Sequence, residues 1–339
     1  MENKFLKINN ERQWQNLLEK ALFKTFFHDL KWEKFLEEKF KWLKFEHFIY
    51  QNRVLLILAR CKVGNKEKLI SHPFCEYGGP LPLIKNIDFK SFKEDLFGQF
   101  KELLKISFHP EISLGPEGEE KYFFGNAENL QFNRCSYIIE GFQIQRHEEL
   151  WQNFRKSTRQ EINKAQNAGL IIKECKDKKE LKDFYSLYLL KAKQHKIPAY
   201  PYSFFKYFFE SPKGEIILAE FENKIVAGSV FLFYDKYIHY FLNASSSEGA
   251  EKRANHLILW EQIKKYCGKG KYFDLGGTRK GSSLEVFKKG FSATHVEIYE
   301  LKNFTEKKKE KFSFIRKAWG FLPTFLIERL SPKLLKYKL

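Results

Sequence analysis

Runs of β-branched and aromatic residues in the second half of the chain predict an antiparallel sheet. Three such runs follow one another, Ile216–Phe221, Lys224–Tyr234 and Tyr237–Asn243. The links between them, Glu222-Asn223 and Asp235-Lys236, have two residues each, which is typical of β-hairpins. The pattern therefore predicts a three-stranded meander over residues 216–243.

Helical spacing of apolar residues flanks this meander on both sides. Before it we expect helices over residues 147–168, ending at Gly169 as a C′ glycine, and over residues 178–196, ending before Pro198. After it we expect a helix (250–266), a strand (272–275), a Gly-Gly break, a short helix (284–289) and a strand (296–301). This order indicates a mixed α/β (α+β) fold with a mostly antiparallel sheet, not an alternating parallel one.

The first half of the chain repeats this pattern faintly. Residues 45–50 and 53–62 read as a hairpin, and residues 91–105 read as a helix that opens with a capping box of Ser91 and Glu94. The segments FIYQNRVLLIL and AEFENKIVAGS align with Asn52 over Asn223. We therefore predict two similar domains, residues 1–146 and 147–304, followed by a basic aromatic tail, residues 305–339.

The chain is strongly basic, with 60 Lys+Arg against 42 Asp+Glu in 339 residues and a net charge of +18. An acidic partner is one interpretation: RNA, an anionic lipid or a phosphorylated precursor. A compositional bias toward lysine explains the total equally well. The excess is concentrated in residues 305–339, which alone carry +7.

Cysteine and histidine spacing argues against a metal site. The five cysteines are scattered with no C-x-x-C pair, and the nine histidines include no H-E-x-x-H. No apolar run approaches the roughly 18 residues that span a bilayer, and the first residues lack the apolar stretch of a secretory signal. We therefore expect a cytoplasmic protein with reduced thiols.

Four separated motifs, taken together, resemble those of FemAB-like proteins, a branch of the GNAT acyltransferase superfamily. They are HPFCEYGGPL (72–81), FRKSTRQEINKAQNAGL (154–170), YFDLGGT (272–278) and VFKKGF (286–291). The resemblance implies two tandem GNAT-like domains. It also implies transfer of an amino acid from aminoacyl-tRNA to a cell-wall peptide precursor, although some members use other donors. No long heptad insertion matches the coiled-coil arm of some members.

Two residues are the candidates for catalysis. The resemblance favours Lys288, which follows Phe287 directly, as a buried cation that stabilises the oxyanion formed in acyl transfer. Asp274, at a strand end before Gly276-Gly277, is placed to take the amine proton or orient the nucleophile. The alternatives are that Lys288 is one more lysine of a lysine-rich chain and that Asp274 caps the following turn.

Further residues are candidates for substrate binding. Arg159 offers a bidentate fork on a helix, or simply a solvated face. Tyr77 and Gly78 form a turn that allows close approach to a substrate or is merely structural. The other candidates follow the meander or the Gly-Gly break: Tyr240, Asn243, Thr278, Arg279 and Lys289. Tyr240 is also explained as a core residue.

The reaction we expect needs no permanently bound cofactor, only an acyl donor. Aminoacyl-tRNA is the donor that the resemblance implies; the alternative is acyl-CoA or an acyl carrier protein, with a lipid or sugar amine as acceptor. Residues 245–260 contain Gly249 but lack the second glycine of a pyrophosphate loop, and Glu251 adds negative charge, which disfavours acyl-CoA.

A third hypothesis is a noncatalytic RNA- or membrane-binding module. The basic aromatic segment 312–339 suits the inner face of a membrane, where a lipid-linked acceptor would lie, or it packs on the second domain.

Overall fold

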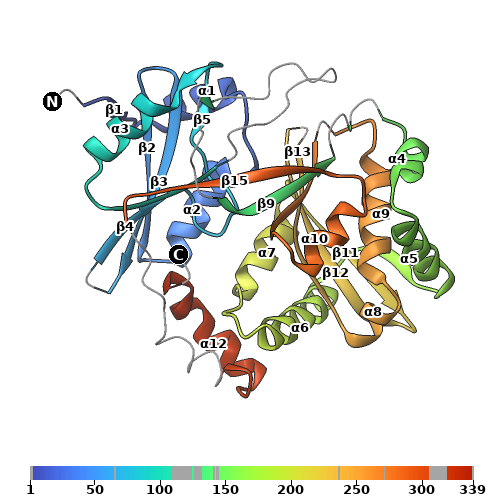
Figure 1. Ribbon diagram of the computed structural model, residues 1–339. Coiled ribbons are helices and arrows are strands. Elements are labelled where there is room, and N and C mark those ends of the chain that lie inside the picture. Colours follow the sequence, from blue (N-terminus) through green and yellow to red (C-terminus); the bar gives the residue numbers. More distant parts are fainter. Residues whose placement is uncertain are drawn as a thin grey trace.

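The computed structural model describes residues 3–64, 66–108, 124–125, 132–139, 142, 145–235, 237–270, 272–304 and 319–337 (Figure 1). The predicted link residue Lys236 lies outside the described residues, and so do residues 305–318 and 338–339 of the predicted tail. No helix in the described ranges is long and apolar enough to cross a lipid bilayer.

The N-terminal half is mostly antiparallel sheet with three α-helices. Its elements are β1 (Phe5–Lys7), α1 (Glu11–Lys20), η1 (Phe26–His28), α2 (Leu30–Lys39), β2 (Leu43–Tyr50), β3 (Val54–Val63), β4 (Lys66–Ile70), β5 (Leu81–Pro82), β6 (Ile87–Asp88), α3 (Phe89–Gln99), β7 (Leu103–Phe108), β8 (Phe124–Gly125) and β9 (Phe132–Ile139).

The C-terminal half alternates helix pairs with longer strands. Its elements are α4 (His147–Asn153), α5 (Lys156–Asn167), β10 (Ile171–Glu174), α6 (Lys178–Gln194), α7 (Tyr202–Glu210), β11 (Gly214–Phe221), β12 (Lys224–Tyr234), β13 (Tyr237–Ser245), α8 (Ser247–Glu251), α9 (Ala254–Tyr266), β14 (Tyr272–Arg279), α10 (Ser283–Lys289), β15 (Thr294–Lys302), α12 (Thr324–Leu334) and η2 (Leu335–Tyr337).

One continuous sheet links the two halves. Its strand order is β1-β2-β3-β4-β7-β15-β9-β14-β13-β12-β11-β10, with β5 paired to β3. Strand β9, from before residue 146, lies between β15 and β14, and β15 pairs with β7 of the N-terminal half. Figure 1 shows β9 and β15 running between the two lobes. The mixed, mostly antiparallel α/β fold is confirmed, while a division of the chain at residue 146 remains a prediction.

The predicted meander is present as β11, β12 and β13, all antiparallel. The first turn holds Glu222 and Asn223 at φ 47° and 61°, and the β2–β3 turn holds Gln51 and Asn52 at φ 47° and 55°. Two consecutive left-handed residues match the twist of a two-residue hairpin. The alignment of the two segments in the sequence therefore corresponds to the same hairpin turn in each half.

Three predicted helices have other bounds in the structure. Residues 147–168 form two helices, because Phe154 and Arg155 are extended between α4 and α5; Gly169 does follow α5 in a left-handed conformation. Residues 250–266 are divided between α8 and α9 by Arg253 at φ 60°. The helix predicted over 91–105 is α3, Phe89–Gln99. It is capped by Asp88, whose carboxylate accepts from Ser91 N–H, rather than by a Ser91–Glu94 box.

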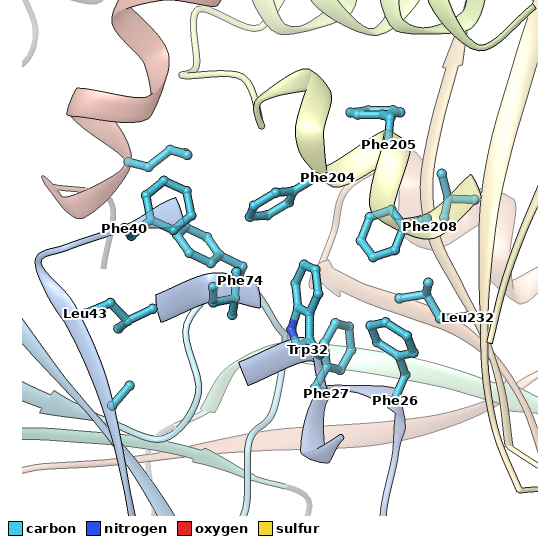
Figure 2. Packing of buried hydrophobic residues seen from close by; sticks show 14 of the residues in the cluster. Phe26, Phe27, Trp32, Phe40, Leu43, Phe74, Phe204, Phe205, Phe208 and Leu232 are labelled. Atoms are coloured by element: carbon cyan, nitrogen blue, oxygen red, sulfur yellow. The ribbon is translucent and has the colours of Figure 1, made fainter. Parts of the chain in front are cut away.

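An aromatic cluster joins the two halves. Phe26 and Trp32 from the N-terminal half lie against Phe208 from α7, and Trp32 also lies against Phe204, as Figure 2 shows. The rings of Trp32 and Phe208 are 5.3 Å apart, and both side chains are fully buried. Because aromatic side chains bury a large apolar area, we expect this cluster to limit the movement of the halves relative to each other.

The described part of the tail packs on the rest of the protein. Trp319 Nε1 donates to the Ile197 carbonyl at 3.0 Å, and the Ser331 hydroxyl accepts from Ala199 N–H at 2.9 Å. Ile327 and Leu335 are fully buried, so one face of α12 belongs to the core. Phe325 on α12 is 65% exposed, and Phe321, just before the helix, is 86% exposed.

Candidate active site

The strands β13 and β14 diverge in the middle of the C-terminal half. Their parallel pairing covers three residues of each strand: Tyr237–His239 of β13 pair with Tyr272–Asp274 of β14. Just beyond, β13 has an extra residue, Phe241, relative to β12, because Tyr240 faces Phe231 and Leu242 faces Val230. Such a bulge bends the strand. The result is an opening whose two sides are the edges of β13 and β14.

Lys288 lies at the β14 side of this opening. The residue is only 3% exposed, and its ammonium donates to the Gly276 carbonyl at 2.6 Å and the Gly277 carbonyl at 2.9 Å. Among the described residues no carboxylate is within ion-pair distance of it. Burial lowers the pKa of Lys288, while the charges of Glu76 and Asp274 oppose this shift. Lys288 is therefore not a solvated surface lysine.

Gly276 and Gly277 of β14 position the side chains of Lys288 and Glu76. Gly276 has φ 77°, a conformation that glycine adopts without strain. A methyl group on it would be 3.5 Å from Lys288 Nζ and 3.6 Å from Glu76 Oε1, so both charged groups lie beside the same point. The Glu76 carboxylate accepts from Gly277 N–H, and a Cβ at Gly277 would clash with that carboxylate. The Gly276-Gly277 pair therefore leaves room for the Lys288 ammonium and the Glu76 carboxylate to lie close together.

Asp274 is fully buried beneath this glycine pair and has many donors. Its carboxylate accepts from Ser136 at 2.5 Å, Gly276 N–H at 2.7 Å and His239 Nδ1 at 2.9 Å. The hydroxyls of Tyr77 and Tyr237 donate to it as well. Although burial opposes ionisation, His239 and these donors hold the pKa of Asp274 well below its usual range.

The geometry gives Asp274 a structural function. A carboxylate of low basicity with five donors is a poor proton acceptor. It does anchor the backbone of Gly276, whose carbonyl holds Lys288. The network also ties residues from both halves to this turn, with Tyr77 from the N-terminal half and Asp274 from β14.

Two cavities flank the opening. The larger has a volume of about 730 Å³ and lies where the two halves meet, with Glu76, Arg134, Thr278 and Arg279 among its lining residues. The smaller, about 180 Å³, is lined by Tyr240, Asn243 and residues of α8, α9 and α10. Leu284 lines both cavities. A reaction across the opening therefore has room for two substrates.

Four of the predicted substrate-binding residues line these cavities. Thr278 and Arg279 line the larger one, and the Thr278 and Ser282 hydroxyls are 2.8 Å apart. Tyr240 and Asn243 line the smaller one. Tyr240 is also 4% exposed and in the core, and burial raises the pKa of its hydroxyl.

The remaining predicted residues do not line either cavity. Arg159 lies on the surface of α5, where it donates to Gln152 at 3.2 Å. Tyr77 is 1% exposed and directed at Asp274. Gly78 packs so closely on Ser71 that a Cβ would be 2.3 Å from the Ser71 carbonyl oxygen. Lys289 points to the surface and pairs with Glu285 at 2.9 Å.

Two residues at the site were not predicted from the sequence. Glu76 directly precedes Tyr77 in the HPFCEYGGPL motif, but its approach to Gly277 spans 201 residues of chain. Lys191 donates to the Asn243 carbonyl at 2.9 Å and the Asn243 side chain at 2.6 Å. A sequence signal existed for Lys191, since it lies three residues after Tyr188 on the buried stripe of α6.

The site has no constellation typical of a metal centre. Over the described ranges, no three His, Cys, Asp or Glu side chains come together as a metal would require. Gly249, the glycine of the segment that would hold the pyrophosphate of acyl-CoA, packs on β12, where a Cβ would lie 2.3 Å from the Val226 carbonyl oxygen. Strand packing thus explains this glycine without a bound cofactor.

Comparison with known proteins identifies the domain that carries this geometry. Residues 152–289 match the model of the acetyltransferase (GNAT) domain family, a range that includes β13, β14 and Lys288. No curated protein sequence matches the chain.

Solved structures show the fold of the whole chain. FemX aligns with a TM-score of 0.59 at 15% identity, over 93% of this chain and 100% of that one. A conserved protein of unknown function from Bacteroides thetaiotaomicron aligns at 0.53 and 12% identity, over 89% and 99%. L-PGS from Bacillus licheniformis aligns at 0.50 and 12% identity, over 93% and 98%. Residues 152–289 therefore form a GNAT-type acetyltransferase domain, and the chain as a whole has the fold of FemX.

Proposed function

We propose that this enzyme transfers an aminoacyl group from aminoacyl-tRNA to an amine of a cell-wall peptide precursor. One observation carries the proposal: Lys288 is a buried ammonium that, within the described residues, is held by the backbone carbonyls of Gly276 and Gly277. Its neighbour Phe287 lines the smaller cavity, and Thr278, which follows Gly277, lines the larger one. Such a fixed cation stabilises the oxyanion that forms when an amine attacks an ester. The FemX-like fold and the net charge of +18 support a nucleic-acid donor.

The residues at the site account for each bond change. The neutral amine attacks the ester carbonyl, so that a C–N bond forms and the carbonyl oxygen becomes an oxyanion beside Lys288. The C–O bond to the tRNA ribose then breaks. Glu76, whose side chain is 18% exposed at the edge of the larger cavity, takes the proton from nitrogen and returns it to the leaving oxygen. Asp274 keeps the Gly276-Gly277 turn in place.

A transfer assay with a matched control tests the proposal. Replacing Lys288 by Met keeps the apolar stem and removes the charge, and we expect turnover of radiolabelled aminoacyl-tRNA with a peptide amine to fall by about 10²–10³-fold. Lys264→Met, on the surface of α9, should keep the wild-type rate. Circular dichroism establishes that both variants are folded. A wild-type rate in Lys288→Met would remove the assignment.

One observation favours the acyl-CoA alternative. The smaller cavity lies beside the start of α9, with Gly249 and Ala250 in its lining, and a helix N-terminus is where a pyrophosphate would bind. Calorimetric titration separates the donors. We expect charged tRNA to bind and acyl-CoA not to bind. Binding and turnover of acyl-CoA without any binding of tRNA would favour the alternative, with a lipid or sugar amine as acceptor.

The exposed side of the C-terminal segment is the part of the protein that we propose to contact a membrane carrying a lipid-linked acceptor. Phe321 and Phe325 are 86% and 65% exposed, and Arg329 and Lys333 are exposed close by. Aromatic and basic side chains together suit an anionic lipid surface. Sedimentation with vesicles containing phosphatidylglycerol should bring down the wild-type protein but not the Phe321→Ser/Phe325→Ser variant. Equal sedimentation of both would contradict this contact.

A further inference from the structure

A second lysine faces the same opening from the opposite strand. Lys191 of α6 donates to the backbone carbonyl of Asn243 on β13, whereas Lys288 of α10 donates to the backbone carbonyl of Gly276 on β14. The two ammonium groups thus lie at the two edges that diverge after His239. Asn243 lines the smaller cavity, so Lys191 is next to a space that can hold a ligand.

The charge of Lys191 is not neutralised within the described residues. Both of its hydrogen bonds are to neutral oxygens of Asn243, and no carboxylate among those residues is within ion-pair distance. The groups that act on it are Asn243 from β13, through two hydrogen bonds, and the charge of Lys288 from α10. Burial first, and then the positive charge of Lys288, lowers the pKa of Lys191 to about 8.

A buried lysine and a half-buried lysine that repel each other are unfavourable unless something compensates their charges. Removing a lysine from water without an acidic partner costs several kcal/mol. An oxyanion seated between the two ammonium groups would recover that cost, because opposite charges attract strongly where water is excluded. Within the described residues no such group is available: Asp274 already has five donors, and Glu76 is bonded to Gly277 N–H with Arg134 3.7 Å away.

We propose that Lys191 and Lys288 together bind a phosphate-type oxyanion of one of the two substrates. This proposal rests on the proposed function for its biological meaning, but the binding of the anion itself does not depend on any transfer reaction. Lys191 binds the anionic group directly, and the positive charge of Lys288 adds to the attraction while it also stabilises the reacting carbonyl. Phosphates of a nucleotide and of a lipid headgroup share this chemistry.

Titration of the full-length protein with inorganic pyrophosphate at pH 7 tests the site directly. We expect saturable binding that weakens at least tenfold in Lys191→Met, is retained in Lys191→Arg, and is unchanged in Lys182→Met, an exposed lysine of the same helix. Adenosine 5′-monophosphate and glycerol 1-phosphate as competitors distinguish a nucleotide from a lipid headgroup as the source. No pyrophosphate binding to the wild type, or equal binding to Lys191→Met, would overturn the proposal even if acyl transfer is observed.

The pH dependence separates anion binding from proton transfer. Because a lysine with a lowered pKa loses its charge early, pyrophosphate affinity of the wild type should fall as the pH rises through about 8. Lys191→Arg should keep its affinity above that pH, since arginine stays charged. If Lys191→Met instead lowers the turnover number with unchanged pyrophosphate affinity, the residue acts as a base and the anion site is refuted.

Discussion

Charged side chains have different partners on the N-terminal sheet and at the opening of the C-terminal half. On the sheet of the N-terminal half, Arg60 is bonded to three carboxylates, those of Glu46 at 2.9 Å, Glu102 at 3.1 Å and Glu67 at 3.2 Å. At the opening of the C-terminal half, Lys288 and Lys191 are bonded to backbone carbonyls and an amide. The surface charge of Arg60 is thus neutralised by carboxylates of its own sheet, where we expect no ligand.

The difference indicates where a ligand is needed. An ion pair on the surface is satisfied by its own chain, and its removal changes little. A buried lysine without an acidic partner lowers the stability of the free protein, and a bound anion or a developing oxyanion offsets that loss. The following experiments test this contrast.

The largest effect is expected from the buried carboxylate beneath the opening. Asp274→Asn exchanges the charge that five donors share for an amide that must itself donate, and we expect the free energy of unfolding to fall by about 3–5 kcal/mol. Chemical denaturation by urea measures this. Ser331→Ala removes two neutral hydrogen bonds, the one accepted from Ala199 N–H and the one donated to the Ile327 carbonyl; it should cost about 1–2 kcal/mol and is the control.

The contribution of Asp274 also has a predictable pH dependence. Because the pKa of this carboxyl is lowered in the folded protein, its stabilisation is fully present above the ordinary aspartate value near 4 and is lost as the pH falls below it. The difference in stability between wild type and Asp274→Asn should therefore stay constant from pH 8 to about 5 and shrink in more acidic solution. A difference that grows on acidification would contradict the network described here.

Sequence and structure agree best where the contacts are local. The meander was predicted because two-residue links such as Glu222-Asn223 are short-range signals. Lys288 was identified because a motif of adjacent residues carries it. The ligands of Asp274 come from positions such as Tyr77 and Ser136, which are 197 and 138 residues away in the chain, and no local pattern specifies such contacts.

The surroundings of the site residues depend on distant contacts in the same way. Asp274 was a candidate to take the amine proton, to orient the nucleophile or to cap the following turn, and its accessibility depends on Tyr77 and His239, which tertiary packing brings to it. Glu76 was overlooked for the converse reason. Within its motif it is one more acidic residue, and only the continuous sheet that joins both halves places it beside Gly277.

A smaller effect than that of Lys288 is expected from Glu76. Glu76→Gln keeps the size and removes the base, so we expect the turnover number to fall about 10²-fold with little change in stability. Glu300→Gln is the matched control, because Glu300 also lines the larger cavity but is paired with Lys105 and Lys302. Single-turnover measurements with aminoacyl-tRNA check the chemical step. An unchanged rate in Glu76→Gln would show that the amine loses its proton to another group.

The smallest effect is expected at the paired charges of the N-terminal half. Arg60 is about one-third exposed, and water screens its ion pairs with the surrounding carboxylates. Arg60→Met should therefore lower the free energy of unfolding by only about 1 kcal/mol, and the loss should shrink in 1 M salt, where the Debye length is about 3 Å. Its transfer rate should equal that of the wild type, because Arg60 lines neither cavity. A large loss of activity in a folded Arg60→Met protein would mean that the N-terminal sheet also binds substrate, and the contrast between the two halves would then not mark the site of the reaction.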